Sequence, residues 1–379
     1  MSRKKAVNNY DQTVMKILTI NTGSSSVRLG LYEADSDGSR RLAAVYLKPG
    51  KRHPEGLLEE FIDKEGGRID AAVHRIVHGG SNLTEPCIIN EEVEGEIERL
   101  SLLAPLHNPL ALKWVRACRA VIGSEISQIA VFDTAFYTSM PEVSKIYALP
   151  KDLSREHGIR RYGFHGIAHR AMLQRYNKLF PDAGNKASVI SIQLGSGCSI
   201  TAIKDGLPVD TSMGFSPNEG LVMSTRSGDI DSGAILYLAE NAGLSINEID
   251  RTLNSSSGLL GISGVSDDMK TLIGSDSPDC KLAVELYCYR VKKYIGAYMA
   301  ALSGVDAILF GGGVGEKSPV IREKILRNME WCGLLIDDRA NEKAIGKEGV
   351  ISSDKSSIDV IVVPVDEAAV MAGEAIGLL

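Results

Sequence analysis

The feature that most constrains the fold is a glycine-rich hairpin that occurs twice in the chain. The first spans residues 16–32 and turns at Gly-Ser-Ser-Ser, residues 23–26, and the second spans 188–203 and turns at Gly-Ser-Gly, residues 195–197. In each, an apolar run with strand propensity enters the turn and a second strand leaves it. Successive N–H groups in such a turn form an anion-binding concavity, although a single turn of this kind would as readily join a surface hairpin. The repeat predicts a duplicated fold whose two turns bind a polyphosphate.

Length and charge limit the remaining possibilities. The chain has 379 residues, which is too long for one ordinary core and predicts two domains. Its 44% hydrophobic and 24% charged residues are typical of a soluble globular protein. The net charge of −6 argues against a general nucleic-acid or acidic-membrane binder. Phosphate must therefore be held by local cations and backbone amides.

Targeting signals are not evident in the sequence. No apolar run reaches the roughly 18–20 residues that cross a bilayer. Residues 1–14 are polar, carry Arg3, Lys4 and Lys5 and lead into no apolar core, so we expect a disordered extension and not a secretory signal. The six cysteines are scattered without a Cys-x-x-Cys pair, which favours free thiols in the cytoplasm.

Apolar periodicity predicts alternating strands and helices, which is the pattern of a layered α/β fold. We expect strands at 15–33 (a pair), 42–48, 70–77, 128–133, 188–203 (a pair), 307–310 and 359–363, and helices at 53–65, 91–103, 110–122, 232–242, 278–304 and 367–378. The apolar positions predicted for the long helix are Leu282, Leu286, Tyr289, Ile295, Tyr298 and Leu302. No low-complexity linker interrupts the chain, so the domain boundary should be a compact hinge near 150–165.

Four residues with catalytic chemistry lie at expected strand ends or loop mouths. Arg75 ends an apolar strand before a Gly-Gly pair, and Asp133 ends the next strand. His165 lies in a turn rich in arginine and aromatic residues, and Arg226 lies between small residues. Taken singly, each could equally form a structural ion pair. Their repeated placement indicates a phosphoryl-transfer site, because such sites need positioning and charge neutralisation.

A zinc site is a weaker interpretation. His165 and His169 have the i, i+4 spacing of a metal pair, but the sequence offers no third ligand. The glycine-rich tip at 311–315 follows an expected strand, and by itself it is weak evidence for a ligand site.

Seven longer segments carry a family resemblance. They are Asn21-Thr-Gly-Ser-Ser-Ser26, His74-Arg-Ile-Val-His-Gly-Gly80, Ala104-Pro-Leu-His-Asn-Pro109, Val131-Phe-Asp-Thr-Ala-Phe136, Arg161-Tyr-Gly-Phe-His-Gly166, Val209-Asp-Thr-Ser-Met-Gly-Phe215 and Ser224-Thr-Arg-Ser-Gly-Asp-Ile-Asp231. From about residue 15 to its end the chain resembles the acetate kinases, short-chain acyl kinases of the sugar kinase, heat-shock protein and actin superfamily.

The resemblance implies a duplicated actin-like, ribonuclease H-like α/β fold with mixed sheets flanked by helices and a central cleft. An N-terminal acyl-kinase lobe would comprise 15–155 and 366–379, and a C-terminal nucleotide-binding lobe would comprise 156–365. The implied reaction is reversible, direct in-line transfer of the ATP γ-phosphoryl to acetate, which yields acetyl phosphate and ADP. Magnesium is the implied metal, with manganese as an alternative, and a homodimer is implied as well.

The resemblance also implies roles for individual residues. Arg75 and Arg226 would bind the acetate carboxylate and the moving phosphoryl group, His165 would donate to the transition-state oxygens, and Asp133 would hold the catalytic arrangement. Asn21 and Glu367 would serve magnesium, and His107 would support the site. The residues implied for ATP or ADP are Ser24, Ser26, Arg28, Gln193, Gly195, Ser196, Gly197, Asp268, Lys270, Gly313, Val314, Gly315 and Lys317.

The acceptor pocket implied by the resemblance is a small apolar patch. It would consist of Val77, Leu106, Phe164 and Pro217. Because one methylene is worth only about 1–3 kcal/mol of discrimination, any preference for acetate over propionate or butyrate should be modest.

Several donor-side positions depart from the family pattern. The departures are Arg28 for lysine, Gln193 for histidine, Ser196 for asparagine, Lys270 for arginine, Lys317 for asparagine, and Ile167-Ala168 for Thr-Ser. Arginine and lysine are not interchangeable where a planar group is needed. GTP or pyrophosphate as donor therefore remains open. A non-enzymatic nucleotide-binding scaffold is disfavoured, because it would predict loss of Arg75, Asp133, Arg226 or Glu367, and all four are present.

Overall fold

The computed structural model describes residues 14–23, 26–36, 38–48, 52–65, 67–182 and 186–379. The chain divides into two compact units: unit 1 runs up to Phe132 and resumes at Glu367–Leu379, and unit 2 is Asp133–Asp366. This division differs from the expected boundary at 155. Residues 133–155 fall in unit 2, where the short helices at 133–137 and 142–145 lie against a helix and a strand of that unit.

Unit 1 is built on the first glycine-rich hairpin. Its elements are β1 (Met15–Thr22), β2 (Val27–Asp35), β3 (Gly38–Leu47), α1 (Pro54–Glu65), β4 (Ala71–Ile76), β5 (Cys87–Ile88), α2 (Glu91–Arg99), η1 (Leu100–Leu102), α3 (Asn108–Ile122), β6 (Ser127–Phe132) and α15 (Glu367–Ile376).

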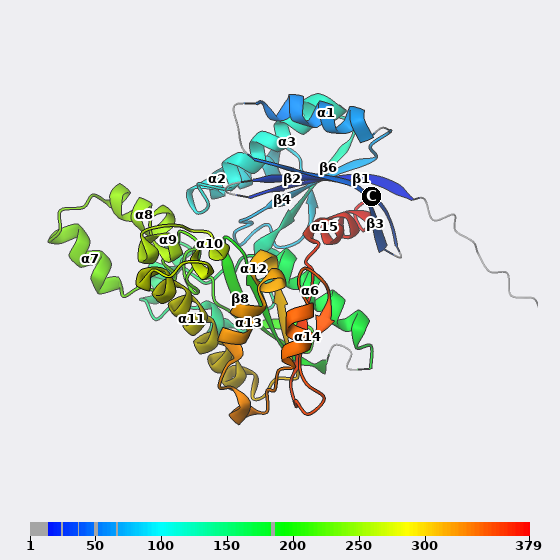
Figure 1. Cartoon of the computed structure of the whole chain (residues 1–379). Coiled ribbons are helices and arrows are strands. Elements are labelled where there is room, and N and C mark those ends of the chain that lie inside the picture. The colour runs from blue at the N-terminus through cyan, green and yellow to red at the C-terminus, as the bar shows by residue number, and fades with distance from the viewer. Residues whose placement is uncertain (1–13, 24–25, 37, 49–51, 66, 183–185) are drawn as a thin grey trace, which may run out of the picture. The chain divides into compact units, whose positions relative to one another are not determined.

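The six strands of unit 1 form one mixed sheet in the order β3-β2-β1-β4-β6-β5. In Figure 1, α1 and α3 cover one face of this sheet and α15 covers the other. Alternate β1 residues Leu18 and Ile20 pack with Trp114 of α3 in a buried apolar cluster. Because side chains alternate along a strand, Asn21 is directed to the face covered by α15.

Unit 2 starts with short helices and then repeats the hairpin. Its elements are η2 (Asp133–Tyr137), α4 (Glu142–Lys145), α5 (Lys151–Glu156), α6 (Gly166–Leu179), β7 (Ser188–Leu194), β8 (Cys198–Lys204), β9 (Leu207–Thr211), α7 (Ser232–Glu240), α8 (Ile246–Ser255), α9 (Gly258–Ser263), α10 (Met269–Ile273), α11 (Pro278–Leu302), β10 (Ala307–Gly311), α12 (Gly312–Lys317), α13 (Pro319–Leu326), η4 (Glu330–Cys332), α14 (Asp338–Lys343), β11 (Gly349–Val350) and β12 (Asp359–Val362).

The sheet of unit 2 has the order β11-β12-β10-β7-β8-β9. Met172 of α6 and Tyr137 of η2 pack on Val189 and Leu309 from one face. The long helix α11 contacts β7 and β8 and also packs with α9, α10 and α13. The glycine-rich turn between β7 and β8 therefore lies at one end of a sheet whose central strands β7, β8 and β10 are largely buried.

The two sheets have the same topology. Each starts with an antiparallel three-stranded meander, β1-β2-β3 or β7-β8-β9. The first strand of each meander then pairs in parallel with β4 or β10, which pairs in parallel with β6 or β12. A short antiparallel strand, β5 or β11, completes each sheet. The predicted duplicated α/β fold with mixed sheets flanked by helices is confirmed.

Most of the glycine-rich tip at 311–315 forms the short helix α12. One local expectation needs correction. Of the stripe predicted for α11, Leu282 and Tyr289 are exposed, whereas Tyr287 and Val291 are buried. The predicted apolar stripe was wrong at Leu282 and Tyr289 because α11 has apolar residues on more than one side. None of the helices within the described ranges is long and apolar enough to cross a membrane.

Candidate functional site

Unit 1 contributes a row of polar side chains at the carboxyl ends of β1 and β4. The Asn21 side chain is central: its Nδ2 donates to Glu367 Oε2 at 2.6 Å, and its Oδ1 accepts from Arg75 Nη1 at 3.2 Å. Glu367 is the first residue of α15, where a negative charge is favourable near the helix N-terminus. Three of the residues predicted for metal and acyl binding are thus in direct contact.

Arg28 lies on the same sheet face as this group. It pairs with Asn21 across the β1–β2 hairpin and with Tyr46 across β2–β3. Its guanidinium lies over the Tyr46 ring, 5.6 Å from the ring centre. The turn closes with a hydrogen bond from Gly23 N to Ser26 O at 2.7 Å, whereas Ser24 lies outside the described residues.

The segment after β4 is held by a reciprocal pair of hydrogen bonds. His78 N donates to Asn108 Oδ1 at 3.2 Å, and Asn108 Nδ2 donates back to His78 O at 3.0 Å. The neighbouring Val77 is buried, while Leu106 is exposed. His107 caps α3, and its carbonyl accepts from the backbone of that helix.

In unit 2, η2 and the start of α6 bring Asp133 and His165 to neighbouring positions. Asp133 is buried, and a Cβ atom on Gly166 would lie only 2.1 Å from its carbonyl oxygen. Only glycine therefore permits this approach of α6 to η2. His165 has φ of 58°, a left-handed conformation that few non-glycine residues adopt. Such strain at a non-glycine residue is typical of functional sites.

His165 and Arg226 converge on the second glycine-rich turn. If Gly197 carried a Cβ atom, that atom would lie 3.2 Å from His165 Nε2 and 3.6 Å from Arg226 Nη1. Arg226 Nη1 also donates to Pro217 O at 2.9 Å. An imidazole edge, a guanidinium and the backbone of a glycine turn at one place are the parts that stabilise a transferring phosphoryl group.

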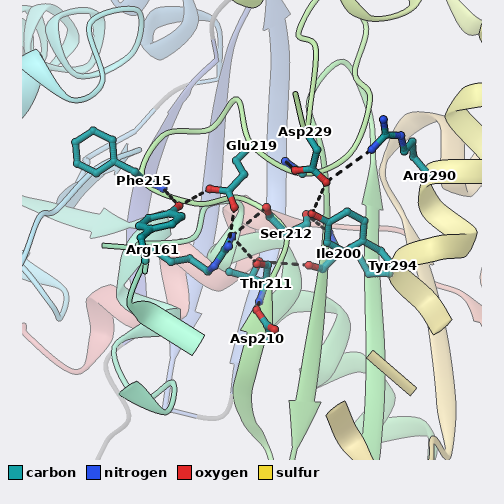
Figure 2. A network of polar contacts seen from close by, with 12 residues as sticks. Arg161, Ile200, Asp210, Thr211, Ser212, Phe215, Glu219, Asp229, Arg290 and Tyr294 are labelled. Carbon is teal, nitrogen blue, oxygen red and sulfur yellow. Dashed lines mark hydrogen bonds and ion pairs between the residues drawn. The ribbon is translucent and has the colours of Figure 1, made fainter. Parts of the chain in front are cut away.

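The loop that carries Pro217 and Arg226 is anchored by a polar network (Figure 2). Arg161 bonds Glu219 Oε1 at 2.6 Å and donates to the carbonyls of Thr211 and Ser212. Asp229 accepts from Gly220 N at 2.8 Å.

The same network reaches α11 at Asp229. Tyr294 donates to Asp229 at 2.8 Å, and Arg290 lies 4.0 Å from that carboxylate. These contacts tie both ends of the loop to neighbouring elements, so Arg226 has a defined position without being buried.

A cavity of about 560 Å3 adjoins the turn. It is lined by Gly195, Ser196, Ser224, Leu259, Asp267, Asp268, Met269, Lys270, Ile273, Tyr287, Gly313, Val314, Lys317 and Ser318. Its volume lies in the roughly 300–1,000 Å3 range of small-ligand pockets. Seven of the predicted donor residues are in this lining: Gly195, Ser196, Asp268, Lys270, Gly313, Val314 and Lys317.

Three other predicted donor residues, all in unit 2, are not in the cavity lining. Gln193 packs against the Gly311–Gly312 backbone, where a Cβ on Gly312 would be 3.0 Å from its Nε2. Gly315 is buried, and its carbonyl accepts from Arg322. Gly197 faces His165 and Arg226 instead. Asp268 lines the cavity, but its carboxylate accepts from Thr271 as a helix cap, which lowers its pKa.

Several contributors were missed by sequence reasoning. Tyr287 both lines the cavity and bonds Cys198 Sγ through its hydroxyl at 3.2 Å, and Cys198 donates to Gly195 O at 3.3 Å. Leu259, Met269 and Ile273 supply an apolar wall. No motif marks them, because apolar residues on short helices look like ordinary core positions.

The predicted acceptor residues are divided between the units. Val77 and Leu106 belong to unit 1, and Phe164 and Pro217 belong to unit 2. Phe164 is buried, and its carbonyl accepts from Tyr137 at 2.7 Å. Pro217 is half-buried beside Arg226.

Comparisons with known proteins bear on this arrangement. The model of the acetokinase family matches residues 51–373. An acetate kinase of Chloroherpeton thalassium is 48% identical over 309 residues, which cover 80% of this chain and 74% of that protein. The crystal structure of Porphyromonas gingivalis acetate kinase matches with a TM-score of 0.84 at 40% identity, over 96% of this chain and 99% of that one.

A propionate kinase structure is about as similar. That enzyme, from Francisella tularensis, gives a TM-score of 0.85 at 35% identity and covers 95% of this chain and 98% of its own. The family match, the identity to the relatives and the duplicated fold agree with one another, and the chain belongs to the acetokinase family.

Proposed function

We propose that the chain is an acetate kinase, which transfers the γ-phosphoryl group of ATP reversibly to acetate and yields acetyl phosphate and ADP. The observation that carries this proposal is the convergence of His165 and Arg226 on Gly197, beside the cavity of about 560 Å3. Family membership supports the same activity.

The proposed mechanism is direct in-line transfer. Arg75 and Arg226 neutralise the acetate carboxylate and the transferring phosphoryl group, and His165 donates to the phosphoryl oxygens. Asp133 holds the catalytic arrangement. We prefer this to a phosphoenzyme because Glu367 already accepts from Asn21 and Asp133 is buried.

Magnesium fits the residues present in unit 1. Mg²⁺ usually keeps several waters and binds one or two carboxylates together with substrate phosphates. Within the described residues no cluster of three or more acidic, histidine or cysteine side chains forms a metal cage. Glu367 would hold the ion and Asn21 would orient that carboxylate. The ion would neutralise phosphate charge, and manganese would serve in the same way.

A nucleotide is the favoured donor. The cavity has an apolar wall of Leu259, Met269 and Ile273 in addition to Lys270 and Lys317. Pyrophosphate has no apolar surface that could pack against such a wall, whereas a nucleobase would bury its ring against it. GTP remains a candidate, since none of these side chains selects adenine over guanine by an evident hydrogen bond.

The acyl chain is left open between acetate and propionate. Val77 limits the predicted pocket, but one methylene is worth only about 1–3 kcal/mol. The chain resembles an acetate kinase and a propionate kinase structure about equally well. We therefore propose acetate as the main acceptor, with slower use of propionate and butyrate.

We also propose a homodimer in the cytoplasm. The dimer rests on family resemblance alone. The six cysteines are all free, which supports a reducing compartment.

The experiment that tests the function is a hydroxamate assay for acyl phosphates. Acetate, propionate and butyrate are each supplied with magnesium and ATP, GTP or pyrophosphate. Highest turnover with acetate and ATP is expected. Turnover only with pyrophosphate would overturn the nucleotide proposal. If no combination of donor and acceptor yields an acyl phosphate, the proposed kinase activity is overturned.

A further inference from the structure

We propose that His169, Ser191 and Ser199 form a buried hydrogen-bond relay that fixes which ring nitrogen of His165 carries the proton. The relay makes neutral His165 present Nε2–H, and not a lone pair, to the phosphate turn. The use assigned to that N–H rests on the proposed function, whereas the relay itself does not.

The relay is continuous from α6 to β7. His165 Nδ1 lies 3.0 Å from Ser199 Oγ, and His169 Nε2 lies 2.7 Å from the same oxygen. On its other side, His169 Nδ1 lies 2.8 Å from Ser191 Oγ. His169 and both serines are fully buried, so bulk water does not compete for these contacts.

Counting protons leaves two arrangements. Burial lowers the pKa of His169 to about 3, so the ring is neutral and has one N–H near neutral pH. Either Ser191 donates to His169 Nδ1 and the His169 proton is on Nε2, or His169 donates from Nδ1 and Ser191 must donate elsewhere.

The surroundings of Ser191 decide between them. In the part of the chain that the structure describes, the other acceptor within its reach is the thioether of Met172, with the sulfur 3.6 Å from Oγ. A thioether sulfur is a weak acceptor, and an imidazole nitrogen is a strong one. Ser191 therefore donates to His169 Nδ1, and His169 carries its proton on Nε2.

The consequence passes through Ser199 to His165. His169 Nε2–H donates to Ser199 Oγ, so the single Ser199 proton is directed to His165 Nδ1. A neutral ring that accepts at Nδ1 carries its proton on Nε2. That edge faces the turn, since a Cβ on Gly197 would lie 3.2 Å from Nε2 and 3.1 Å from Cε1.

The charges around His165 make a neutral donor useful. Arg226 approaches the same position from the loop, so a positive charge is already present there. Asp133, packed through its backbone against the residue after His165, is the acidic group on the η2 side. With the relay, His165 donates a hydrogen bond to an anion without having to be protonated.

The first test reads the tautomers directly. Long-range proton–nitrogen spectra of the full-length enzyme with nitrogen-15 histidine are recorded near pH 7.5, with resonances assigned from His165→Gln and His169→Gln. Nε2–H on both rings is expected. A neutral His165 with its proton on Nδ1 would overturn the relay, and this result needs no variant of a relay serine.

The second test removes the start of the relay. Ser191→Ala should leave both His169 tautomers populated, give a mixture at His165, and lower kcat roughly tenfold with KM nearly unchanged. Ser191→Thr restores a hydroxyl and should restore both the tautomer and kcat. A wild-type tautomer and kcat in Ser191→Ala would contradict the proposal.

A matched control separates the relay from general packing. Thr201 is a buried hydroxyl on the same sheet that bonds Tyr137 and Thr211 instead. Thr201→Val should leave the His165 tautomer unchanged, and an equal shift in this variant would count against the relay. Because the spectra need no substrate, an enzyme with the expected tautomers but no turnover would refute the proposed function alone.

Discussion

At the scale of single residues, Arg226 carries positive charge to the turn while remaining half-buried. Its Nη1 has a backbone partner in Pro217 O, which orients the guanidinium without neutralising it. We propose that this contact holds the guanidinium in position for an anion.

Replacing this arginine should remove activity and leave the fold. Arg226→Ala is expected to lower kcat roughly 10²–10³-fold, the usual loss when a preorganised donor is removed from a charged transition state. Acetyl phosphate formation and thermal unfolding measure the two effects. Arg327→Ala, which removes an exposed arginine paired with Glu323, is the control and should change neither. Near-normal turnover in Arg226→Ala would remove the residue from the mechanism.

Buried histidines set the acid sensitivity of the protein. Burial lowers the pKa of His74 and of His78 to about 4 and that of His169 to about 3. An unfolded chain takes up these protons near pH 6.5, so stability falls as the pH drops below 6.5 towards these values. Between pH 7 and pH 5, each of these histidines should lower the free energy of unfolding by about 2 kcal/mol.

Urea unfolding at pH 7 and pH 5 measures that loss. His74, whose Nε2 lies 2.7 Å from Gln128 Oε1, offers the cleanest variant. His74→Gln should reduce the fall between the two pH values by about 2 kcal/mol. An unchanged fall would show that His74 does not contribute to it.

At the scale of elements, the duplicated hairpin has equivalent positions that carry different chemistry. Asn21 of unit 1 corresponds to Gln193 of unit 2, since each precedes the turn glycine by two residues. Opposite them lie Arg28 and Ser199, respectively. Unit 1 thus presents Arg28 and the Asn21 amide on this face. In unit 2, Ser199 at the equivalent position contacts His165 and His169 instead.

The anchored loop of unit 2 is the element most open to test. Tyr294→Phe removes a hydrogen bond to Asp229 and leaves the rest of α11 in place. We expect a loss of about 1.5–3 kcal/mol in stability, as for a bond to a charged group, together with a lower kcat because the Arg226 loop loosens. Tyr289→Phe, on an exposed tyrosine of the same helix, should leave both unchanged. Equal behaviour of the two variants in kcat and urea unfolding would contradict this reading of Figure 2.

At the scale of the whole molecule, the two places where the chain passes between units carry carboxylates. Asp133 is the first residue of unit 2, and Glu367 is the first after the chain returns to unit 1. Motion at these crossings would therefore act directly on residues proposed for catalysis. Phosphoryl transfer needs water kept from the transferring group, which favours closure on ligand binding.

Closure can be measured by small-angle X-ray scattering. Adding acetate with a non-hydrolysable ATP analogue and magnesium should reduce the radius of gyration, and either ligand alone should reduce it less. A radius that stays constant with both ligands bound would contradict closure.

Much of the fold follows from local sequence pattern. The two hairpins, the parallel strands after them and the helices at 54–65 and 278–302 were expected close to their observed bounds because they have strong periodicity or turn residues. Short helices such as α9 and α10 were missed, since a few apolar residues without periodicity do not mark a helix.

The sequence by itself determined the duplicated hairpins and the type of chemistry, because glycine turns and isolated arginines at strand ends are local signals. Only the tertiary structure decided which residues act together. His169 and Ser191 are 22 positions apart and carry no motif, yet α6 packing on β7 brings them within 2.8 Å. In the same way, Tyr287 reaches Cys198 from a helix 89 residues away along the chain. Such contacts depend on how buried faces pack, and no local pattern records them.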